Sequence, residues 1–236
     1  MLVRFSIKNY KPFKEEVNFS LIASNYDKTR QEENIFEVPE FGLKLLKSAV
    51  VYGANASGKS KLTEAMHFMK DFVIRSSRET QKGDRINVQP FLLSTETEDA
   101  PSEFEIIFVH KSGLFRYGFE VTPDRVEAEW LFHRGKAKKA KEVEIFYREG
   151  QHFDLHRSRF KTAKALVEGK MIRSNALLIS VAAQFNDKLA GQVLDWFLKF
   201  KVISGLREEG YQGFTMGKTK DEQTKQDIIK KKKKAD

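Results

Sequence analysis

The sequence predicts an α/β fold in which a phosphate-binding loop joins a buried parallel strand to a helix, with an antiparallel β-subdomain inserted after that helix. Three observations lead to this prediction. Residues 53–60, Gly-Ala-Asn-Ala-Ser-Gly-Lys-Ser, fit the pattern G-x-x-x-x-G-K-[ST]. Small and β-branched residues at 48–52 precede the loop, and apolar residues with helical spacing follow it to about Arg75. Four segments between 104 and 147 have the patterns of strands.

The loop contains the chemical groups that hold a nucleoside triphosphate. We expect Gly53 and Gly58 to adopt backbone angles closed to other residues, so that successive N–H groups form a nest for phosphate oxygens. Lys59 adds a positive charge for the β- and γ-phosphates, and Ser60 offers its hydroxyl to Mg²⁺. The predicted contacts to ATP are Gly53, Asn55, Ala56, Ser57, Gly58, Lys59 and Ser60, with Ser60 also the metal ligand. The alternative is a chance match in a Gly/Ser turn.

Two alternating segments at the N-terminus predict a β-hairpin. Residues 2–7 and 17–22 alternate between apolar and polar side chains, and residues 9–12 supply turn chemistry. Residues 24–43 are polar and without periodicity, which predicts a surface loop.

The segments after the loop helix predict an antiparallel meander followed by a return to the α/β layer. The expected strands are 104–109, 114–121, 126–132 and 143–147, with a fifth candidate at 152–155. A helix is expected at 162–167, a second buried parallel strand at 176–181, and a helix at 185–200 with Asn186 and Asp187 as caps. The predicted organisation is an ATP-binding lobe at 1–214 and a Lys-rich tail at 215–236. Within the lobe we distinguish 1–75 (hairpin, strand, loop and helix), 100–156 (β-subdomain) and 157–214 (return strand and helix).

Composition predicts a soluble, cytoplasmic protein. The 236 residues are 40% hydrophobic and include 20 Phe, yet no apolar run is long enough to cross a membrane. There is no cysteine, which excludes disulfides, thiolate nucleophiles and zinc–thiolate sites.

The net charge of +9 is concentrated in two short segments. Residues 134–142 and residues 218–236 each carry a net charge of +4. One interpretation is a solvated hairpin tip and a solvated tail; the other is contact with the phosphate backbone of a nucleic acid through these Lys-rich segments.

The sequence gives little support for a further metal site or for a different kind of catalytic site. His152 and His156, with Asp154 between them, are a weak candidate for metal ligands. No G-x-S-x-G motif marks a serine nucleophile. Glu127 and Glu129 fall on one face of their predicted strand, where like charges are typical of a solvated surface.

The N-terminal hairpin adds a resemblance. The pattern Ile7-x-Asn9-Tyr10-x-x-Phe13, followed some forty residues later by the phosphate-binding loop, resembles the N-terminal lobe of ABC-type ATPases related to the SMC and recombination proteins. It is more closely similar to AAA-type ATPases of phage-defence and abortive-infection systems, near the overcoming-lysogenization-defect nucleases. The resemblance covers about residues 1–214 and implies a P-loop NTPase lobe of ABC-ATPase type. It also implies that Gln184, after the second parallel strand, senses Mg²⁺ and the attacking water, and that Lys11 lies near the phosphates.

The departures from that family point to an incomplete catalytic apparatus. An ABC-type site needs a Ser-Gly-rich signature from a partner and a strand that ends in an acidic pair. Ser204-Gly205 is at most a fragment of a signature, and Asp195 is interpreted as a solvent-facing helix residue. We therefore expect an N-terminal lobe without its catalytic half, from a trimmed chain or an interrupted gene, which acts with a second copy or a partner ATPase lobe. An effector nuclease is a further expected partner.

Two alternatives remain open at this point. One is a complete small P-loop kinase or GTPase, although the guanine-reading tetrad Asn-Lys-x-Asp is absent from the sequence. The other is a non-catalytic module that binds nucleotide or nucleic acid without turnover.

Overall fold

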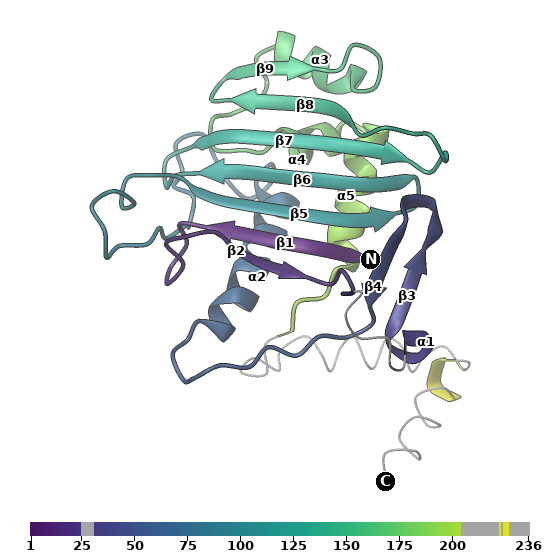
Figure 1. Ribbon diagram of the computed structural model, residues 1–236. Helices are drawn as coiled ribbons and strands as arrows, with labels where there is room; N and C mark the ends of the chain where they lie inside the picture. Colours follow the sequence, from purple (N-terminus) through teal and green to yellow (C-terminus); the bar gives the residue numbers. More distant parts are fainter. Residues whose placement is uncertain (25–30, 204–221, 223, 227–236) are drawn as a thin grey trace. The chain divides into compact units, whose positions relative to one another are not determined.

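The computed structural model describes residues 1–24, 31–203, 222 and 224–226, in two units, Met1–Lys201 and Val202–Asp236. The first unit is a mixed α/β body whose described residues form a seven-stranded antiparallel sheet with helices behind it (Figure 1). In the second unit, residues 222 and 224–226 are helical, and Lys225 pairs with Glu222 at 3.5 Å. The predicted boundary at 214, Ser204-Gly205 and the lysines at 230–234 lie outside the described residues.

The predicted N-terminal hairpin is confirmed. Strand β1 (Leu2–Lys8) pairs antiparallel with β2 (Val17–Ser20), with Phe5 opposite Phe19. Alternating apolar residues place Val3, Phe5 and Ile7 of β1 in buried positions, which is what a half-buried strand requires.

The antiparallel meander is also confirmed, with all five predicted strands present. They are β5 (Ser102–His110), β6 (Gly113–Val121), β7 (Val126–Gly135), β8 (Val143–Glu149) and β9 (His152–Leu155). The strand order is β2-β1-β5-β6-β7-β8-β9. The sequence predicted the meander as a separate, inserted subdomain, and this prediction is wrong. Strand β1 pairs along β5 and places Ile7 opposite Phe104. The two parts therefore share one sheet and one core.

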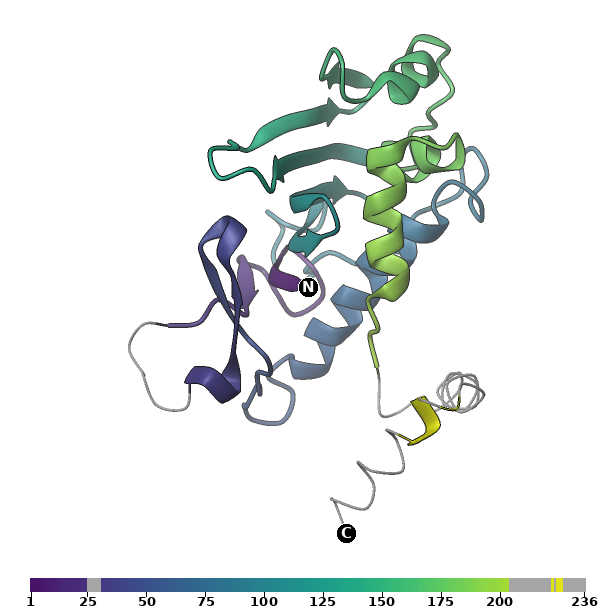
Figure 2. The same cartoon turned by 90° about the vertical axis from the view of Figure 1, so that its right-hand side faces the viewer.

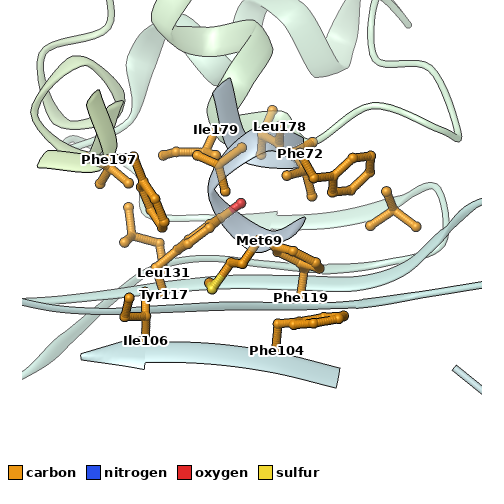
Figure 3. Close-up of a cluster of buried hydrophobic side chains, with 14 of the residues drawn as sticks. Met69, Phe72, Phe104, Ile106, Tyr117, Phe119, Leu131, Leu178, Ile179 and Phe197 are labelled. Carbon is orange, nitrogen blue, oxygen red and sulfur yellow. The ribbon is translucent and has the colours of Figure 1, made fainter. Parts of the chain in front are cut away.

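The core lies between the sheet and the helices. Helix α2 (Lys59–Arg75) and helix α5 (Lys188–Lys199) lie side by side on the same face of the sheet (Figure 2). Their buried residues meet an aromatic layer on the strands, part of which is drawn in Figure 3. The fully buried phenylalanines of the sheet are Phe5, Phe104, Phe108, Phe115, Phe119 and Phe146. Each contributes on the order of 1.5–3 kcal/mol through burial, so this layer makes a large contribution to stability.

A second hairpin occupies the region predicted as a surface loop, so that prediction is wrong. Helix α1 (Gln31–Asn34) leads into β3 (Ile35–Val38), and a 3₁₀ turn (Pro39–Phe41) leads into β4 (Leu43–Leu46). Val38, Phe41 and Leu45 form a small core with Val3 of β1. The two four-residue strands are too short to show periodicity, and this packing rather than local pattern makes them form.

The two predicted parallel strands are not present. Residues 48–52 form no strand, and the side chains of Val50 and Tyr52 are 71% and 87% exposed. A strand needs a neighbouring strand to pair with, and no described strand pairs with residues 48–52. The segment 176–181 enters helix α4 (Leu178–Gln184) instead. A short buried apolar run is compatible with either a strand or a helix, which explains the error.

The remaining helices agree with their predictions. Helix α3 (Lys161–Glu168) covers the expected 162–167. Helix α5 begins after Asp187, whose carboxylate accepts hydrogen bonds from the N–H groups of Leu189 and Ala190 at 2.9 and 3.0 Å. This is the expected helix cap.

Candidate nucleotide-binding site

The phosphate-binding loop lies in a cleft of about 680 Å³, within the size range of small-molecule sites. Three segments line the cleft. They are residues 55–61 of the loop and the start of α2, Lys11 and Pro12 of the N-terminal turn, and residues 89–93 between α2 and β5. Segments far apart in the sequence thus meet around the predicted loop.

The backbone of the loop has the form of an anion nest. Ala56 and Gly58 have positive φ values of 64° and 93°. Gly58 is the N-cap of α2, and the cap has no side-chain hydrogen bond. Among the described residues, no acceptor takes the N–H groups of Gly58, Lys59 or Ser60. Free N–H groups at the positive end of a 17-residue helix fit the oxygens of a phosphate group.

The two glycines of the loop play different parts. Gly58 needs its positive φ, and a Cβ there would also lie 3.1 Å from the ring of Phe13. Gly53 does not have a positive φ, so the prediction of a special backbone angle there is wrong. A larger residue does not fit at this position, because a Cβ on Gly53 would lie 2.7 Å from the hydroxyl of Ser57.

The side chains of Lys59 and Ser60 both lie at the loop. Nζ of Lys59 donates to the carbonyl oxygens of Gly53 and Ala54, both at 2.7 Å, so the ammonium group lies on the loop. The hydroxyl of Ser60 is exposed and makes no hydrogen bond within the described part of the chain. A free hydroxyl at the first turn of the helix is a suitable oxygen ligand for Mg²⁺.

Lys11 lies in the same cleft and has an unusual backbone. It follows Tyr10 in a two-residue turn closed by reciprocal 2.9 Å hydrogen bonds between Tyr10 and Phe13. Its φ of 51° is one that glycine adopts easily and lysine does not. Its ammonium group pairs with Glu64 of α2, and this hydrogen bond, followed by that of Lys61, lowers the pKa of Glu64. The backbone N–H of Lys11 donates to Gln89 at 3.0 Å.

A comparison with protein families identifies the domain that contains this cleft. Residues 48–170, more than half of the chain, match the family described as "AAA domain, putative AbiEii toxin, Type IV TA system". The chain belongs to this family. It is therefore a P-loop ATPase of the abortive-infection kind, and an AAA domain of this type implies nucleotide binding, typically with Mg²⁺. A comparison with curated proteins gave no match.

The matched region contains two walls of the cleft, the loop at 53–60 and the segment 89–93. Lys11 and the N-terminal hairpin lie before it. In the part of the AAA protein that the structure describes, no helix is long and apolar enough to cross a membrane.

Two substitutions at Lys11 separate the effect of its backbone conformation on stability from the effect of its side chain. Lys11→Ala keeps the positive φ on a residue with a Cβ, whereas Lys11→Gly removes that strain. We expect Lys11→Gly to be more stable than Lys11→Ala by about 1 kcal/mol, although glycine is normally the less stable choice. Urea denaturation of both variants measures this. A less stable Gly variant would contradict the backbone argument.

Asn9 supports one wall of the cleft, a role that the sequence motif containing it does not indicate. It is 2% exposed, and its carboxamide oxygen accepts the N–H of Phe91 at 2.9 Å. Its NH₂ group donates to the carbonyl oxygens of Thr97, Ala100 and Pro101 at 2.9, 2.8 and 3.2 Å. Asn9 thus fixes both ends of segment 91–101, whose first residues form a wall of the cleft.

The cleft contains a glutamine, but it is not Gln184. Gln184 is the exposed last residue of α4 and does not line the cleft. Its predicted role rested on a strand at 176–181 that is a helix, so the reason for choosing it is gone. Gln89 lines the cleft instead, and its carbonyl oxygen accepts the N–H of Lys11.

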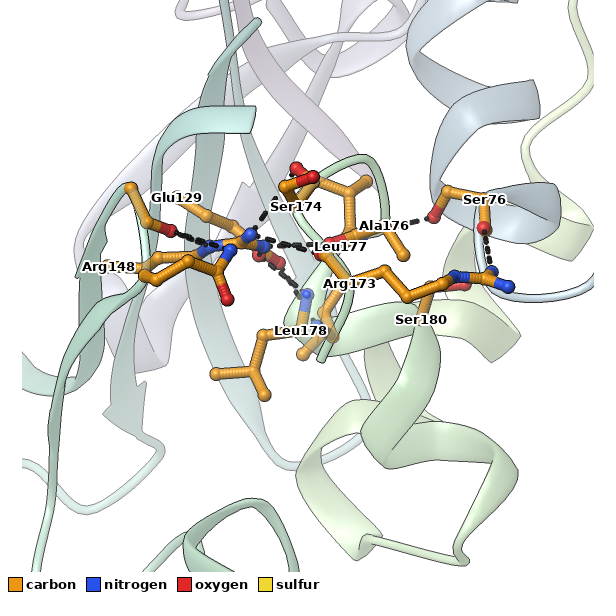
Figure 4. A network of polar contacts seen from close by, with 12 residues as sticks. Ser76, Glu129, Arg148, Arg173, Ser174, Ala176, Leu177, Leu178 and Ser180 are labelled. Carbon is orange, nitrogen blue, oxygen red and sulfur yellow. Dashed lines mark hydrogen bonds and ion pairs between the residues drawn. The ribbon is translucent and has the colours of Figure 1, made fainter. Parts of the chain in front are cut away.

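A buried polar network anchors the far end of the loop helix, and it corrects the interpretation of Glu129 (Figure 4). Glu129 is fully buried rather than solvated, opposite Arg148 in the register of β7 and β8. Its carboxylate accepts the N–H groups of Leu178 and Ile179 at 2.7 and 3.0 Å, which caps α4. Burial raises the pKa of Glu129, although the Arg148 guanidinium 3.5 Å away favours the carboxylate.

The same network reaches helix α2 at its C-terminal end. Arg173 donates to the carbonyl oxygens of Ser76 and Ser77 at 3.2 and 3.3 Å. Ser77 and Ser180 are joined through their hydroxyls at 2.8 Å. The helix that begins at the phosphate-binding loop is therefore tied to the sheet and to α4 where it ends.

The other residues that the sequence singled out lie away from the cleft. Asp195 is on α5, as predicted, where it pairs with Lys111, Lys199 and His110. The hydrogen bond from Lys111 is the first cause of its lowered pKa. The described residues contain no group of three side chains suited to hold a metal ion, so His152 and His156 gain no support.

Proposed function

We propose that the cleft binds ATP together with Mg²⁺. The observation that supports this most strongly is the set of three free N–H groups, on Gly58, Lys59 and Ser60, at the N-terminus of a helix that opens into the cleft. Three lysines, Lys11, Lys59 and Lys61, border the same space. Free amide donors, positive charge and a helix dipole together favour a polyphosphate over a neutral ligand.

In this proposal each residue has a defined task. The amides of Gly58, Lys59 and Ser60 would hold phosphate oxygens, and the ammonium groups of Lys59 and Lys11 would balance their charge. The hydroxyl of Ser60 would be a ligand of Mg²⁺, which neutralises phosphate charge when it is bound. Leu92 and Leu93, 57% and 88% exposed at the opposite wall, offer apolar surface that suits the face of a nucleobase.

We further propose that the domain is an ABC/SMC-like lobe of a phage-defence or DNA-maintenance system, which works with a second ATPase lobe. Among the described residues, no acidic side chain lines the cleft, so a group that positions water would come from elsewhere. The exposed apolar side chains of Val50, Val51 and Tyr52, just before the loop, support contact with such a lobe. We therefore expect slow hydrolysis by this chain alone.

Replacing Lys59 by Ala tests the nucleotide proposal. The change removes a cation that faces the phosphates, a charge-assisted contact worth about 1.5–3 kcal/mol, so ATP affinity should fall by about one to two decades. Isothermal titration of both proteins with ATP and Mg²⁺ measures the loss. Lys82→Ala, at an exposed lysine outside the cleft, is the control and should bind as the wild type does. Equal affinity of wild type and Lys59→Ala would refute the assignment.

A further inference from the structure

One edge of the large sheet gathers positive charge from segments that are separated in the sequence. Strands β5, β7 and β9 run in the same direction, because neighbouring strands of the meander are antiparallel. The connections that follow these three strands therefore share one edge, on the right in Figure 1. We call residues 134–142, which begin at the end of β7, and residues 156–164, which follow β9, the basic edge. Each of these two segments carries a net charge of +4.

Most cations of the basic edge are exposed and lack counter-charges. Lys164 is exposed but pairs with Glu168 at 3.7 Å, and Arg134 is half-buried. The seven exposed cations that remain are Lys136, Lys138, Lys139, Lys141, Arg157, Arg159 and Lys161. None of these seven forms an ion pair with a carboxylate in the described ranges. The carboxylate of Glu142, within the same edge, is already paired with Arg116 at 2.9 Å.

The two segments lie on either side of the start of β8. Phe160 is buried and stacks on Phe146 of β8 at 5.2 Å, which holds the flanking Arg159 and Lys161 beside that strand. The backbone N–H of His156 donates to the carbonyl oxygen of Ile145 in β8 at 2.9 Å, and Val143 at the start of β8 lies opposite His133 of β7. The loop after β7 and the segment after β9 are therefore neighbours.

The opposite edge of the sheet has the opposite charge. The segment that leads into β5 carries Glu96, Glu98, Asp99 and Glu103 without a lysine or arginine among them. Lys11, in the turn that follows β1, belongs to that opposite edge, since β1 is antiparallel to β5. The basic edge is thus a local feature of the fold, and it lies away from the nucleotide cleft.

We propose that the basic edge binds the phosphate backbone of double-stranded nucleic acid. From β7 to β9 the sheet spans two strand spacings, or about 10 Å. Duplex DNA presents roughly six phosphate charges over the same length. The basic edge exposes no aromatic side chain for stacking and no large apolar side chain for membrane insertion. The contact is therefore electrostatic and independent of base sequence.

The test compares two double variants of the full chain in fluorescence anisotropy with a mixed-sequence DNA duplex. Each contact with a phosphate adds about −0.9 to the log–log salt slope, so Arg157→Gln/Arg159→Gln should make the slope shallower by about 1.8. Lys14→Gln/Lys82→Gln removes the same charge outside the basic edge and should leave the slope unchanged. For a wild type that contacts about four phosphates, affinity should fall by about two decades between 50 and 200 mM salt.

Three results would overturn the proposal. They are equal slopes for the two double variants, duplex binding that does not depend on salt, and binding to anionic phospholipid vesicles without binding to the duplex. ATP affinity should be unchanged in Arg157→Gln/Arg159→Gln, which shows that the variant is folded and that the two sites are independent.

Discussion

Arg148→Met is expected to destabilise the protein by about 3–5 kcal/mol, the usual cost of removing one partner of a buried ion pair. Arg148 is fully buried beside Glu129 and donates to the carbonyl oxygens of Ala176 and Gly150 at 2.7 and 2.8 Å. Methionine fills similar space but leaves the Glu129 carboxylate without its counter-charge. Urea denaturation followed by circular dichroism measures the loss.

A double-mutant cycle shows whether the charge is the cause. Glu129→Gln is destabilising in the wild type, because Arg148 then lacks its counter-charge and one N–H of α4 loses its acceptor. In the Arg148→Met background only the second loss remains, so the same substitution should cost clearly less. Arg125→Met, at an exposed ion pair with Glu127 on the same strand, is the control and should have a small effect. Additive effects of the Arg148 and Glu129 substitutions would contradict a coupled buried pair.

Asn9→Gly is expected to destabilise the protein by about 2–4 kcal/mol and to weaken ATP binding. Glycine adopts the backbone φ of 50° easily, so the lost free energy of unfolding comes from the four side-chain hydrogen bonds of Asn9. Each of these is worth about 0.5–1.5 kcal/mol. Without them the segment 91–101, which carries a wall of the cleft, is no longer fixed. Urea denaturation and calorimetric titration with ATP and Mg²⁺ measure the two effects.

Asn186→Gly is a matched control for that experiment. Asn186 has nearly the same backbone φ, 61°, but its side chain is exposed and makes no hydrogen bond with the described residues. The same substitution there should change neither stability nor ATP affinity appreciably. Equal effects at Asn9 and Asn186 would show that the Asn9 side chain does not hold the cleft wall.

The features that the sequence predicted well are those specified by local pattern. The loop at 53–60 is recognisable because its chemistry resides in consecutive residues, and the strands β5 to β9 alternate strongly enough to be found one by one. Helix α5 follows from helical spacing and the cap at Asp187.

The errors concern features that depend on distant partners. The run at 48–52 predicts burial, but a strand there needs neighbours that the described residues lack. The run at 176–181 becomes a helix because Glu129, far away in sequence, accepts the N–H groups of Leu178 and Ile179. Asn9 is a single polar residue without periodicity, so only the fold shows which carbonyl groups it joins.

Hydrogen exchange measured by mass spectrometry, with and without ATP and Mg²⁺, tests the central claim most directly. The nucleotide should protect amides in two segments that are distant in the sequence, the loop and first turn of α2 at 53–61 and the cleft wall at 89–93. The basic edge at 134–142 should exchange as before. Protection of the basic edge without protection of 53–61, or no protection at all at saturating ATP, would contradict the assignment of this cleft as the nucleotide site.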